Sequence, residues 1–511
     1  MHTPTDEQAH AADTFRAGHH LVLQAGAGTG KTSTLALLAA GTTRRGRYLA
    51  FNKDIARDAA GRFPGTVRCK TAHATAYAAL GHRYARRLNG PRQPAWRTGQ
   101  ALGITHPVRI GKRNITQRTL SHAVVRTVTH FCHSTDRALA HHHVPRLRGL
   151  DTPAEHAHLA EVILPFAAKV WADLQNPEQG AARFEHDHYL KMWALTGPKI
   201  EAAFLFLDEA QDTNPVLEQV FAAQRDHAQL VMVGDSAQAI YGWRGARDVM
   251  TGFDAAQLTL TRSFRFGPSI ADQANRWLAL ANAPIRLTGT DTIPAEVGDV
   301  TRPDAVLCRT NIGAMAEVMR LLADGHRVAL TRGGQQLAAL ATAARDLKDG
   351  RRTNHPELVL FTSWGELQDY AAYDPAGRDL QPFVDLIDTH GPDAILAAVD
   401  ELTDESTADV TVSTAHKAKG REWPTVKIAE DFPEPKNTDQ HDPQGRPIPE
   451  PVSDTDARLA YVAVTRARSR LDLGGLSWID SLPKPVRYQP QPNATPATDL
   501  HGSGPAYVVQ G

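Results

Sequence analysis

The sequence has few cysteines, no long apolar run and no excess of charge of either sign. Only three cysteines occur in 511 residues, at positions 69, 132 and 308. An odd number of widely separated cysteines excludes a disulfide framework and a cysteine-rich zinc site, and it is typical of a protein from a reducing compartment. We therefore expect a cytoplasmic location.

The chain also lacks the marks of a membrane protein. No stretch of 18 or more apolar residues occurs, so neither a transmembrane helix nor a membrane partner is predicted. The first seven residues do not begin a basic segment followed by an apolar run, so a signal peptide is not expected. Basic and acidic side chains both number 56, which gives a formal charge of zero. That balance argues against a uniformly basic nucleic-acid coat protein and is compatible with a local basic groove.

What the chain does contain is the rhythm of two α/β units. Short apolar runs followed by Gly, Asn or Asp predict buried parallel strands at 20–24, 48–51, 204–207, 230–233, 305–308, 328–331, 410–413 and 426–428. Helical patterns lie between them, which is typical of crossover connections. Residues 82–198 and 334–408 are mostly helical in pattern and predict one insertion in each unit. The Pro-, Gln- and Thr-rich C-terminal segment predicts a disordered tail.

The clearest chemical signal is the segment Ala-Gly-Ala-Gly-Thr-Gly-Lys-Thr at 25–32. It follows the first predicted strand and begins a helical stretch. Glycines allow backbone N–H groups to surround phosphates, while Lys31 reaches the β- and γ-phosphates and Thr32 binds Mg²⁺. Ala25 stands where the first glycine of such loops usually falls. A simple glycine-rich turn before a helix is the alternative, but it does not account for strand, loop, Gly-Lys-Thr and helix in this order.

Acidic and polar side chains follow the last two predicted strands of the first unit, 204–207 and 230–233. Asp208 and Glu209 come directly after 204–207 and are suited to binding Mg²⁺ and to polarising a water, respectively. The alternative is a helix N-terminus that favours acids. Gln238, after 230–233, is a candidate sensor of the γ-phosphate. Just beyond it, Tyr241 and Trp243 lie beside Arg244. These aromatic residues predict either a surface on which bases stack or side chains buried in the core.

Histidine is abundant, with 24 residues, and invites a metal-site hypothesis. Three consecutive histidines at 141–143 point in different directions on a helix or a strand. His186 and His188 flank Asp187, but no paired cysteine completes a zinc site. We expect these histidines to be polar surface residues of the first insertion, some of them near phosphates.

In their order, these segments resemble the motifs of superfamily 1 helicases of the UvrD/Rep/PcrA type. Three further segments match as well: Leu-Thr-Arg-Ser-Phe-Arg at 260–265 resembles the motif that enters the second motor domain, and 413–423 and 459–468 resemble the fifth and sixth motifs. The likeness spans most of 4–473. Segments 48–53, 69–73 and 419–423 are most similar to the F-box DNA helicase and phage-type branch, here without room for an F-box before the first motif.

The resemblance implies an α/β fold with two RecA-like P-loop motor domains, each a parallel sheet flanked by helices and each with a mainly helical insertion. The first motor domain would comprise 1–81 and 199–262, with its insertion at 82–198. The second would comprise 263–333 and 409–475, with a reduced insertion at 334–408. Residues 476–511 would form the Pro-rich tail.

The resemblance also implies ATP and Mg²⁺ as cofactors and assigns roles to matching residues. The catalytic set would be Lys31, Asp208, Glu209, Gln238, Arg265 and Arg466, with Thr32 and Asp208 binding Mg²⁺. ATP would be bound by Gln8, Ala25, Gly26, Ala27, Gly28, Thr29, Gly30, Lys31, Thr32, Ser33, Phe264 and Glu422. Single-stranded DNA would be contacted by Phe51, Asn52, His73, Tyr241, Trp243, Arg244 and His416. For Arg468, a solvated helix face is the favoured interpretation.

The implied function is that of an ATP-dependent DNA helicase or translocase. It would move 3′-to-5′ on single-stranded DNA, or on DNA with single-stranded tails, in repair, recombination or replication. A monomer is expected, with accessory repair or replication proteins as candidate partners. One alternative is a DNA-stimulated ATPase that strips proteins from DNA without separating strands. A non-enzymatic DNA-binding module with a relic ATP site is a second, against which the intact Lys31, Asp208, Glu209, Arg265 and Arg466 argue.

Overall fold

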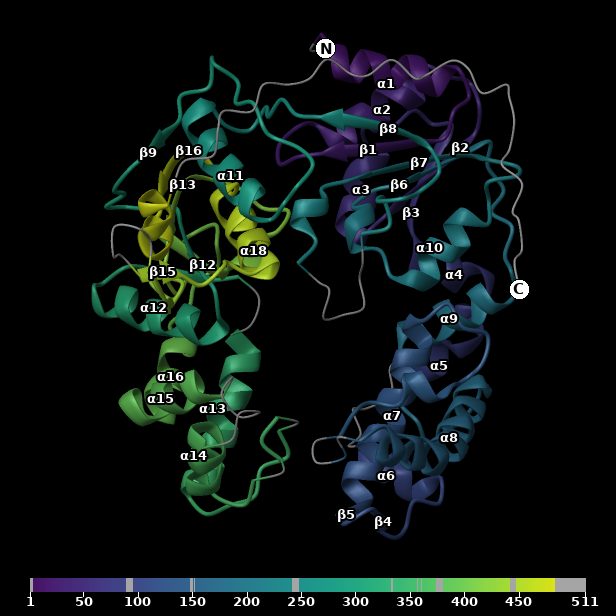
Figure 1. Ribbon diagram of the computed structural model, residues 1–511, viewed down its shortest axis with the longest axis vertical. Helices are drawn as coiled ribbons and strands as arrows, with labels where there is room; N and C mark the ends of the chain where they lie inside the picture. Colours follow the sequence, from purple (N-terminus) through teal and green to yellow (C-terminus); the bar gives the residue numbers. More distant parts are fainter. Residues whose placement is uncertain are drawn as a thin grey trace, which may run out of the picture.

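Two α/β domains lie side by side, and each carries a helical extension on the same side of the molecule (Figure 1). The computed structural model describes residues 3–88, 95–147, 150, 152–240, 248–331, 334–355, 357–359, 361–373, 380–441 and 447–482. Residues 483–511 of the predicted tail lie outside this part. So do Tyr241, Trp243 and Arg244, three of the residues predicted to contact single-stranded DNA.

The first domain is built on a six-stranded parallel sheet with the order β3-β2-β6-β7-β1-β8. Its strands are β1 Leu21–Ala25, β2 Gly46–Ala50, β3 Val67–Thr71, β6 Phe204–Leu207, β7 Gln229–Gly234 and β8 Ala256–Leu260. The four strands predicted from apolar runs are the four central ones. The two edge strands, β3 and β8, were missed because their outward-facing positions are polar or only partly buried, so they contain no continuous apolar run.

Side chains alternate between the two faces of this sheet, as the pleat of a strand requires. Leu21 and Leu23 of β1 pack in one core cluster with α1 Asp6–Arg16, α2 Lys31–Ala40 and α3 Lys53–Ala60. Val22, between them, packs in another cluster with α4 Ala72–Ala79 and α10 Pro215–Ala222. Helices therefore cover both faces, and the carboxyl ends of the strands are left as the edge where the polar motifs gather.

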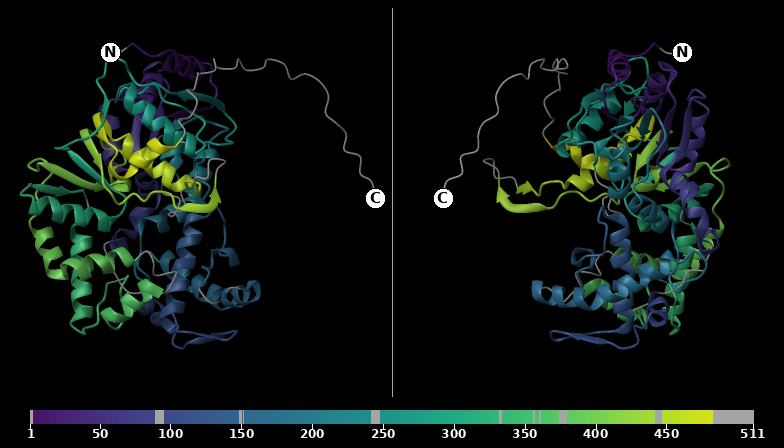
Figure 2. Two further views of the ribbon diagram at one scale, coloured as in Figure 1. Left: turned by 60° about the vertical axis from the view of Figure 1, so that its left-hand side comes forward. Right: turned by 90° about the vertical axis from the view of Figure 1, so that its right-hand side faces the viewer.

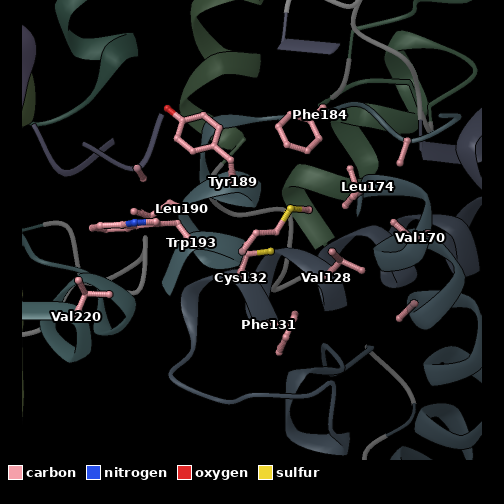
Figure 3. Close-up of a cluster of buried hydrophobic side chains, with 14 of the residues drawn as sticks. Val128, Phe131, Cys132, Val170, Leu174, Phe184, Tyr189, Leu190, Trp193 and Val220 are labelled. Carbon is pink, nitrogen blue, oxygen red and sulfur yellow. The ribbon is translucent and has the colours of Figure 1, made fainter. Parts of the chain in front are cut away.

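The first insertion extends the second of these clusters rather than forming a separate core. Phe131 and Cys132, with Leu190 and Trp193, pack toward Val220 of α10 (Figure 3). The elements of the insertion are η1 Gly81–Tyr84, α5 Ala85–Leu88, α6 Ala95–Ala101, β4 Val108–Ile110, β5 Arg113–Ile115, α7 Gln117–His133, η2 His141–His143, α8 Pro153–Gln175 and α9 His186–Leu195. The insertion is mainly helical, as predicted, with one small hairpin, β4–β5, that the sequence did not indicate.

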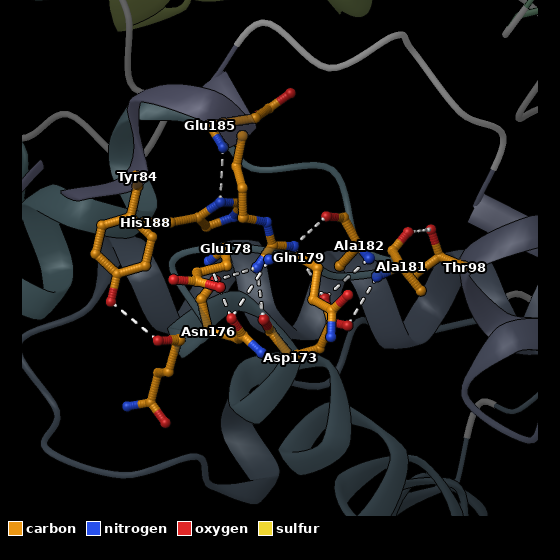
Figure 4. A network of polar contacts seen from close by, with 12 residues as sticks. Tyr84, Thr98, Asp173, Asn176, Glu178, Gln179, Ala181, Ala182, Glu185 and His188 are labelled. Carbon is orange, nitrogen blue, oxygen red and sulfur yellow. Dashed lines mark hydrogen bonds and ion pairs between the residues drawn. The ribbon is translucent and has the colours of Figure 1, made fainter. Parts of the chain in front are cut away.

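A buried arginine organises the C-terminal end of α8. The Arg87 guanidinium donates to the carbonyl oxygens of Asp173, Asn176 and Ala182 at 2.6–2.7 Å. It also pairs with the Asp173 carboxylate at 3.1 Å, and that carboxylate accepts the backbone N–H groups of the loop that follows (Figure 4). A single charged pair thus ties α5, α8 and the segment leading to α9.

The second domain has its own six-stranded parallel sheet, ordered β11-β12-β10-β13-β16-β9. Its strands are β9 Glu296–Val297, β10 Ala305–Cys308, β11 Val328–Leu330, β12 Val410–Thr414, β13 Trp423–Ile428 and β16 Ala467–Asp472. One face packs against α11 Pro268–Leu280 and α18 Asp454–Val464. The other packs against α12 Asn311–Ala323 and the second insertion, which consists of α13 Gly334–Lys348, α14 Trp364–Tyr373, α15 Gln381–His390 and α16 Pro392–Asp400.

Two features of the second domain differ from the predictions. Residues 476–481, assigned to the tail, lie in the short helix η6 Gly474–Ser481, where Leu476 and Ile479 are buried in the domain core. Arg468 lies on strand β16 rather than on a helix. A hairpin of β14 Asn437–His441 and β15 Pro447–Pro449 projects from this domain (Figure 2).

The predicted fold class is confirmed: there are two parallel-sheet α/β domains flanked by helices, each with a mainly helical insertion. Within the described part of the chain, every helix is too short or too polar to cross a bilayer.

Candidate nucleotide site and strand cleft

The glycine-rich loop connects β1 to α2. Gly28 and Gly30 have φ values of 75° and 80°, in the left-handed region that residues with a side chain rarely adopt. A Cβ on Gly28 would lie 2.6 Å from Ser263 Oγ, so glycine is also needed for the close approach of the segment that joins the two domains. Lys31 Nζ donates to the carbonyl oxygens of the first two loop residues at 3.3 Å. The loop has the backbone form and the lysine that phosphate binding requires.

Asp208 follows β6 and lies opposite the loop. Thr32 Oγ1 is 3.4 Å from Asp208 Oδ2, which also accepts a hydrogen bond from the hydroxyl of Tyr48. Burial, and next the neighbouring Glu209 carboxylate, raise the pKa of Asp208 to about 6. A carboxylate buried next to a hydroxyl provides the oxygen ligands that Mg²⁺ prefers, so Thr32 and Asp208 fit the cation predicted for them.

Glu209 is held in an uncommon backbone conformation at the same edge. Its φ is 52°, although it is not a glycine. Its Oε2 accepts a hydrogen bond from Gln211 Nε2 at 2.5 Å. Burial alone would raise the pKa of Glu209, but the positive charges of Lys31 and then Lys419 outweigh it and lower the pKa. Glu209 is therefore ionised at neutral pH, as a base that polarises a water must be.

The second domain reaches this site through α18. The Tyr461 hydroxyl accepts a hydrogen bond from the Ala27 N–H in the phosphate loop at 3.0 Å. The same hydroxyl donates to Asp235 Oδ2 at 2.8 Å, and Gln238 Nε2 donates to that oxygen at 2.7 Å. Tyr461 is fully buried. One side chain of the second domain therefore contacts both the phosphate loop and the carboxylate that positions the candidate sensor Gln238.

A buried ion pair makes a second link between the domains. Lys419, just after α17 Ala415–Ala418, donates from Nζ to Asp212 Oδ2 at 2.5 Å and to the Gln238 carbonyl oxygen at 2.6 Å. Both charged side chains are buried. Burial raises the pKa of Asp212 to about 6, against the effect of Lys419. Opening of the domains would expose both charges to solvent, so the ion pair forms only in the closed arrangement.

The two arginines predicted to take part in catalysis, Arg265 and Arg466, both donate hydrogen bonds to Thr465. Arg466 is buried, and its Nη2 lies 2.9 Å from Thr465 Oγ1 and 3.5 Å from Gln238 Oε1. Burial, and next the charge of Arg265, lower the pKa of Arg466 to about 9. Arg265 Nη1 donates to the Thr465 carbonyl oxygen at 2.9 Å, and its Nε donates to Glu422 Oε2 at 2.6 Å. The structure thus brings Gln238, Arg265, Arg466 and Glu422 together at the domain interface.

The predicted adenine end lies at the start of the chain. Gln8 closes a capping box with Thr5 at the start of α1, and its Nε2 donates to Thr34 Oγ1 at 3.0 Å. Phe264 is 44% exposed. A Cβ on Gly30 would lie 3.3 Å from Gln8 Nε2 and 3.7 Å from the Phe264 ring, which places both side chains beside the phosphate loop. An amide and an exposed aromatic ring at that position suit recognition of a purine base.

A cleft of about 1690 Å³ runs between the two domains, away from the adenine end. Phe51, Asn52 and His416, three of the predicted strand contacts, line it. Phe51 is 47% exposed, whereas Asn52 uses its side chain to cap α3. His73 does not line this cleft; it lines a smaller cavity of about 400 Å³ that shares Phe51 and Asp212 with the cleft.

Comparison with known proteins identifies the family. The family model described as the UvrD/REP helicase N-terminal domain matches residues 193–253, and that of the UvrD-like helicase C-terminal domain matches residues 332–476. F-box DNA helicase protein 1 of Schizosaccharomyces pombe is 30% identical over 497 residues, covering 89% of this chain. The chain belongs to the UvrD-like helicases. F-box DNA helicase 1 of Gallus gallus is 28% identical over 502 residues, again 89% of this chain.

This UvrD-like chain spans about half the length of the curated relatives that it matches, 55% of the yeast protein and 47% of the chicken protein. A shorter similarity, 32% identity over 157 residues, relates 26% of the chain to 14% of the RecBCD enzyme subunit RecB of Mycobacterium tuberculosis. The predicted resemblance to the F-box branch of UvrD-like helicases is confirmed.

Sequence reasoning missed several residues of the site in this UvrD-like helicase. Tyr48, Tyr461 and Lys419 lie inside the motif segments 48–53, 459–468 and 413–423, and Asp235 lies between the strand 230–233 and Gln238. None of the four was assigned a role, because their chemistry depends on partners in other elements. Glu7 is a further case, since its carboxylate binds the Thr261 N–H and hydroxyl at 2.9 and 2.7 Å and so ties α1 to the inter-domain segment. The cleft also contains Arg309, Asn311 and Lys417. Polar residues directly after the strand 305–308 were the available signal for the first two.

One group of three candidate metal ligands occurs among the described residues: Asp136, His142 and His143. His143 Nδ1 accepts the Ala140 N–H at 2.9 Å, which leaves its proton on Nε2, the atom that would have to bind the metal. The buried Lys191 ammonium donates to the carbonyl oxygen of Asp136. Both facts disfavour a cation. His143 was expected at the surface and is instead buried, because its two ring nitrogens are paired within the loop.

Proposed function

We propose that the chain is an ATP-dependent DNA helicase or translocase that moves 3′-to-5′ on single-stranded DNA. The observation that carries the proposal is the division of one nucleotide site between two domains. The phosphate loop, Asp208 and Glu209 lie on the first domain. From the second domain, Tyr461 contacts the phosphate loop, and Lys419 and Arg466 contact the neighbouring Asp212 and Gln238. A site that is complete only when the cleft is closed couples each round of hydrolysis to closing and opening.

The proposed chemistry follows from the positions of the side chains. Thr32 and Asp208 would hold Mg²⁺, which would supply charge neutralisation at the phosphates. Lys31 would contact the β- and γ-phosphates, and Glu209 would polarise the attacking water. Arg265 and Arg466 would stabilise the charge that develops on the γ-phosphate, and Gln238 would report its state to Asp235. Gln8 and Phe264 would bind the base, and Glu422 the ribose.

We assign the strand path to the inter-domain cleft. Exposed Phe51 offers a stacking surface, and Asn52, His73 and His416 supply polar contacts. The relatives' names support DNA as the substrate. The proposed role is in repair, recombination or replication, with or without accessory proteins. The three free cysteines suit a reducing compartment. All parts of the nucleotide site come from one chain, which supports action as a monomer.

The alternative is a DNA-stimulated ATPase that displaces proteins without separating strands. The length of the second insertion favours it, because residues 334–408 form a smaller insertion than residues 82–198 do in the first domain. In both cases the motor domains are 1–81 with 199–262 and 263–333 with 409–475.

The test uses one preparation of the full chain. ATP turnover is measured with and without single-stranded DNA. Strand displacement is measured on 3′-tailed, 5′-tailed and blunt duplexes. Streptavidin displacement is measured on biotinylated single strands. We expect stimulation by single strands and unwinding only from 3′ tails. Streptavidin displacement without unwinding would establish the alternative. Lys31→Ala is the control, and unchanged DNA-stimulated turnover in it would refute the assigned nucleotide site.

A further inference from the structure

Asp187 joins the first motor domain to its insertion through two histidines. His73 Nε2, on α4, lies 3.0 Å from Asp187 Oδ1, and His133 Nε2, at the end of α7, lies 3.0 Å from Asp187 Oδ2. Each carboxylate oxygen therefore binds one imidazole. Because Nε2 of each ring faces the carboxylate, Nδ1 is the ring nitrogen that remains for a ligand. Among the residues that the structure describes, neither Nδ1 has a hydrogen-bond partner.

This trio lines the cavity of about 400 Å³ beside the strand cleft. The cavity and the cleft share Phe51, the exposed aromatic residue assigned to stacking, so a strand that passes Phe51 also passes the trio. The backbone around the trio is fixed by packing: Cys132, which precedes His133, and Leu190, one turn after Asp187, belong to one buried cluster (Figure 3). The imidazoles are therefore presented by rigid elements.

The charge of the trio is decided by its histidines. Burial alone would raise the pKa of Asp187, but the hydrogen bonds from His133 and His73 outweigh it and hold the pKa well below its usual range. Asp187 is therefore an anion throughout the working pH range. With both imidazoles protonated the trio carries one net positive charge; with one protonated it is neutral; with none it is negative. Histidine changes charge between about pH 5 and 8.

Two of the other titratable groups near the trio, His188 and Tyr189, do not change charge in this range. Burial lowers the pKa of His188 to about 4, which keeps it neutral, and burial raises the pKa of the Tyr189 hydroxyl to about 12. Asp212, paired with Lys419, and Asp208, which contacts Thr32 and Tyr48, line the same cavity, and their raised pKa values of about 6 fall in the same range. The variants at His133, rather than the wild-type profile alone, therefore identify the contribution of the trio. The remaining groups around the trio, by element, are Tyr77 on α4, Cys132 on α7, His186 and Lys191 on α9, and Lys53 on α3.

We propose that His73 and His133, positioned by Asp187, form a subsite for one backbone phosphate of the single-stranded DNA. The first motor domain and its insertion share this subsite. It makes binding of the single strand stronger at acidic pH. The inference rests on the proposed function, because it presumes a single strand in the cleft. Asp187 acts as a positioning residue, since its carboxylate holds both rings through their Nε2 atoms. A phosphate supplies the negative charge that two imidazolium groups and one carboxylate leave unmatched.

The experiment measures binding of a fluorescently labelled oligothymidylate to the full chain by anisotropy, from pH 5.5 to 8.5 and at several salt concentrations. In the wild type, affinity falls as pH rises through the histidine range. In His133→Gln, affinity at pH 6 falls about 5- to 10-fold, and the salt dependence decreases by roughly 0.7, the value of one phosphate contact on a single strand. In His133→Lys, the charge is permanent, so affinity at pH 8 exceeds that of the wild type.

Asp187→Asn tests the positioning role separately. Loss of the carboxylate destabilises the charged imidazoles, so the midpoint of the affinity change moves to lower pH. The chain offers a control in the same insertion, because Asp136 also contacts two imidazoles, His142 and His143, at 2.6 and 2.9 Å, both through Oδ2, and does not line the cavity. His142 is 66% exposed, and His142→Gln should reproduce the wild-type pH profile.

The outcomes distinguish this proposal from the proposed function. A wild type that does not bind single strands refutes both. A wild type that binds, with His133→Gln and His133→Lys retaining its pH profile and salt dependence, refutes the phosphate subsite and leaves the helicase proposal intact. Circular dichroism melting of each variant checks folding, and the gain of affinity in His133→Lys cannot arise from misfolding.

Discussion

The hydroxyl of Tyr461 in the second domain lies 3.0 Å from the Ala27 N–H in the phosphate loop of the first. The two residues are 434 positions apart in the chain. The same hydroxyl donates to Asp235, which also accepts from Gln238. A residue of the sixth motif thus contacts the loop that is expected to bind phosphate. Opening of the cleft must break this contact, and closure must remake it.

Tyr461→Phe should therefore slow turnover more than it weakens nucleotide binding. The variant keeps the ring and removes a hydrogen bond to a charged group, worth about 1.5–3 kcal/mol, so DNA-stimulated ATP hydrolysis should fall at least about 10-fold. The measurement is kcat and KM for ATP at saturating single-stranded DNA. Tyr84→Phe is the matched control, because its hydroxyl donates only to the Gln175 carbonyl in the insertion. Equal losses in both variants would contradict a coupling role.

Tyr48→Phe should weaken Mg²⁺ binding in acid. In the proposed site Asp208 would bind the cation when ionised, so affinity should rise as pH increases through its raised pKa of about 6. The hydrogen bond from Tyr48 lowers that pKa, and its loss moves the acidic limb of the profile to higher pH. We expect the Mg²⁺ concentration for half-maximal ATP turnover to rise about 10-fold at pH 6. At pH 8 the difference should shrink, and an equal difference at both values would refute the assignment.

Arg466→Ala should abolish most of the catalytic rate. An arginine that completes a phosphoryl-transfer site across an interface contributes about 10³-fold or more to kcat. Because Arg466 is buried, binding of a fluorescent ATP analogue must show that the variant still folds and binds nucleotide. Arg468→Ala is the control, since the Arg468 side chain is exposed and its pair with Glu422, at 3.8 Å, is worth about 1 kcal/mol or less. Comparable kcat values in the two variants would refute the role of Arg466.

Arg87→Met should destabilise the insertion. The variant removes the charge that pairs with the Asp173 carboxylate, which keeps only its backbone N–H donors, and it removes a donor from three carbonyl oxygens. Breaking such a pair typically costs about 3–5 kcal/mol. Thermal and urea unfolding measure the change. Arg57→Met removes an exposed pair with Asp54 instead and should change stability by about 0.5 kcal/mol or less. A stable Arg87→Met protein would mean that water replaces the guanidinium in this network.

In the first sheet, the sequence predicted the four central strands because they are buried on both faces, and burial on both faces leaves continuous apolar runs such as Phe204–Leu207. It missed β3 and β8, whose outward side chains are polar or half-exposed. The start of the predicted tail was wrong by several residues, because Leu476 and Ile479 are two isolated apolar residues whose burial depends on the finished domain. His143 was misplaced for the same reason: its ring is paired by loop atoms that no local pattern reveals.

The candidate site divides in the same way. Loop backbone, strand ends and residue types are local, so Lys31, Thr32, Asp208 and Glu209 could be named from the chain alone. The contacts of Tyr461 with Ala27, of Lys419 with Asp212, and of Asp187 with His73 and His133 join segments more than 50 residues apart. Sequence alone determined the family, the fold class and the chemistry of the phosphate loop, because those depend on short motifs and on strand burial. Tertiary structure alone decided which charges meet, because the energy of an ion pair or a buried hydrogen bond depends on the distance and burial that folding imposes.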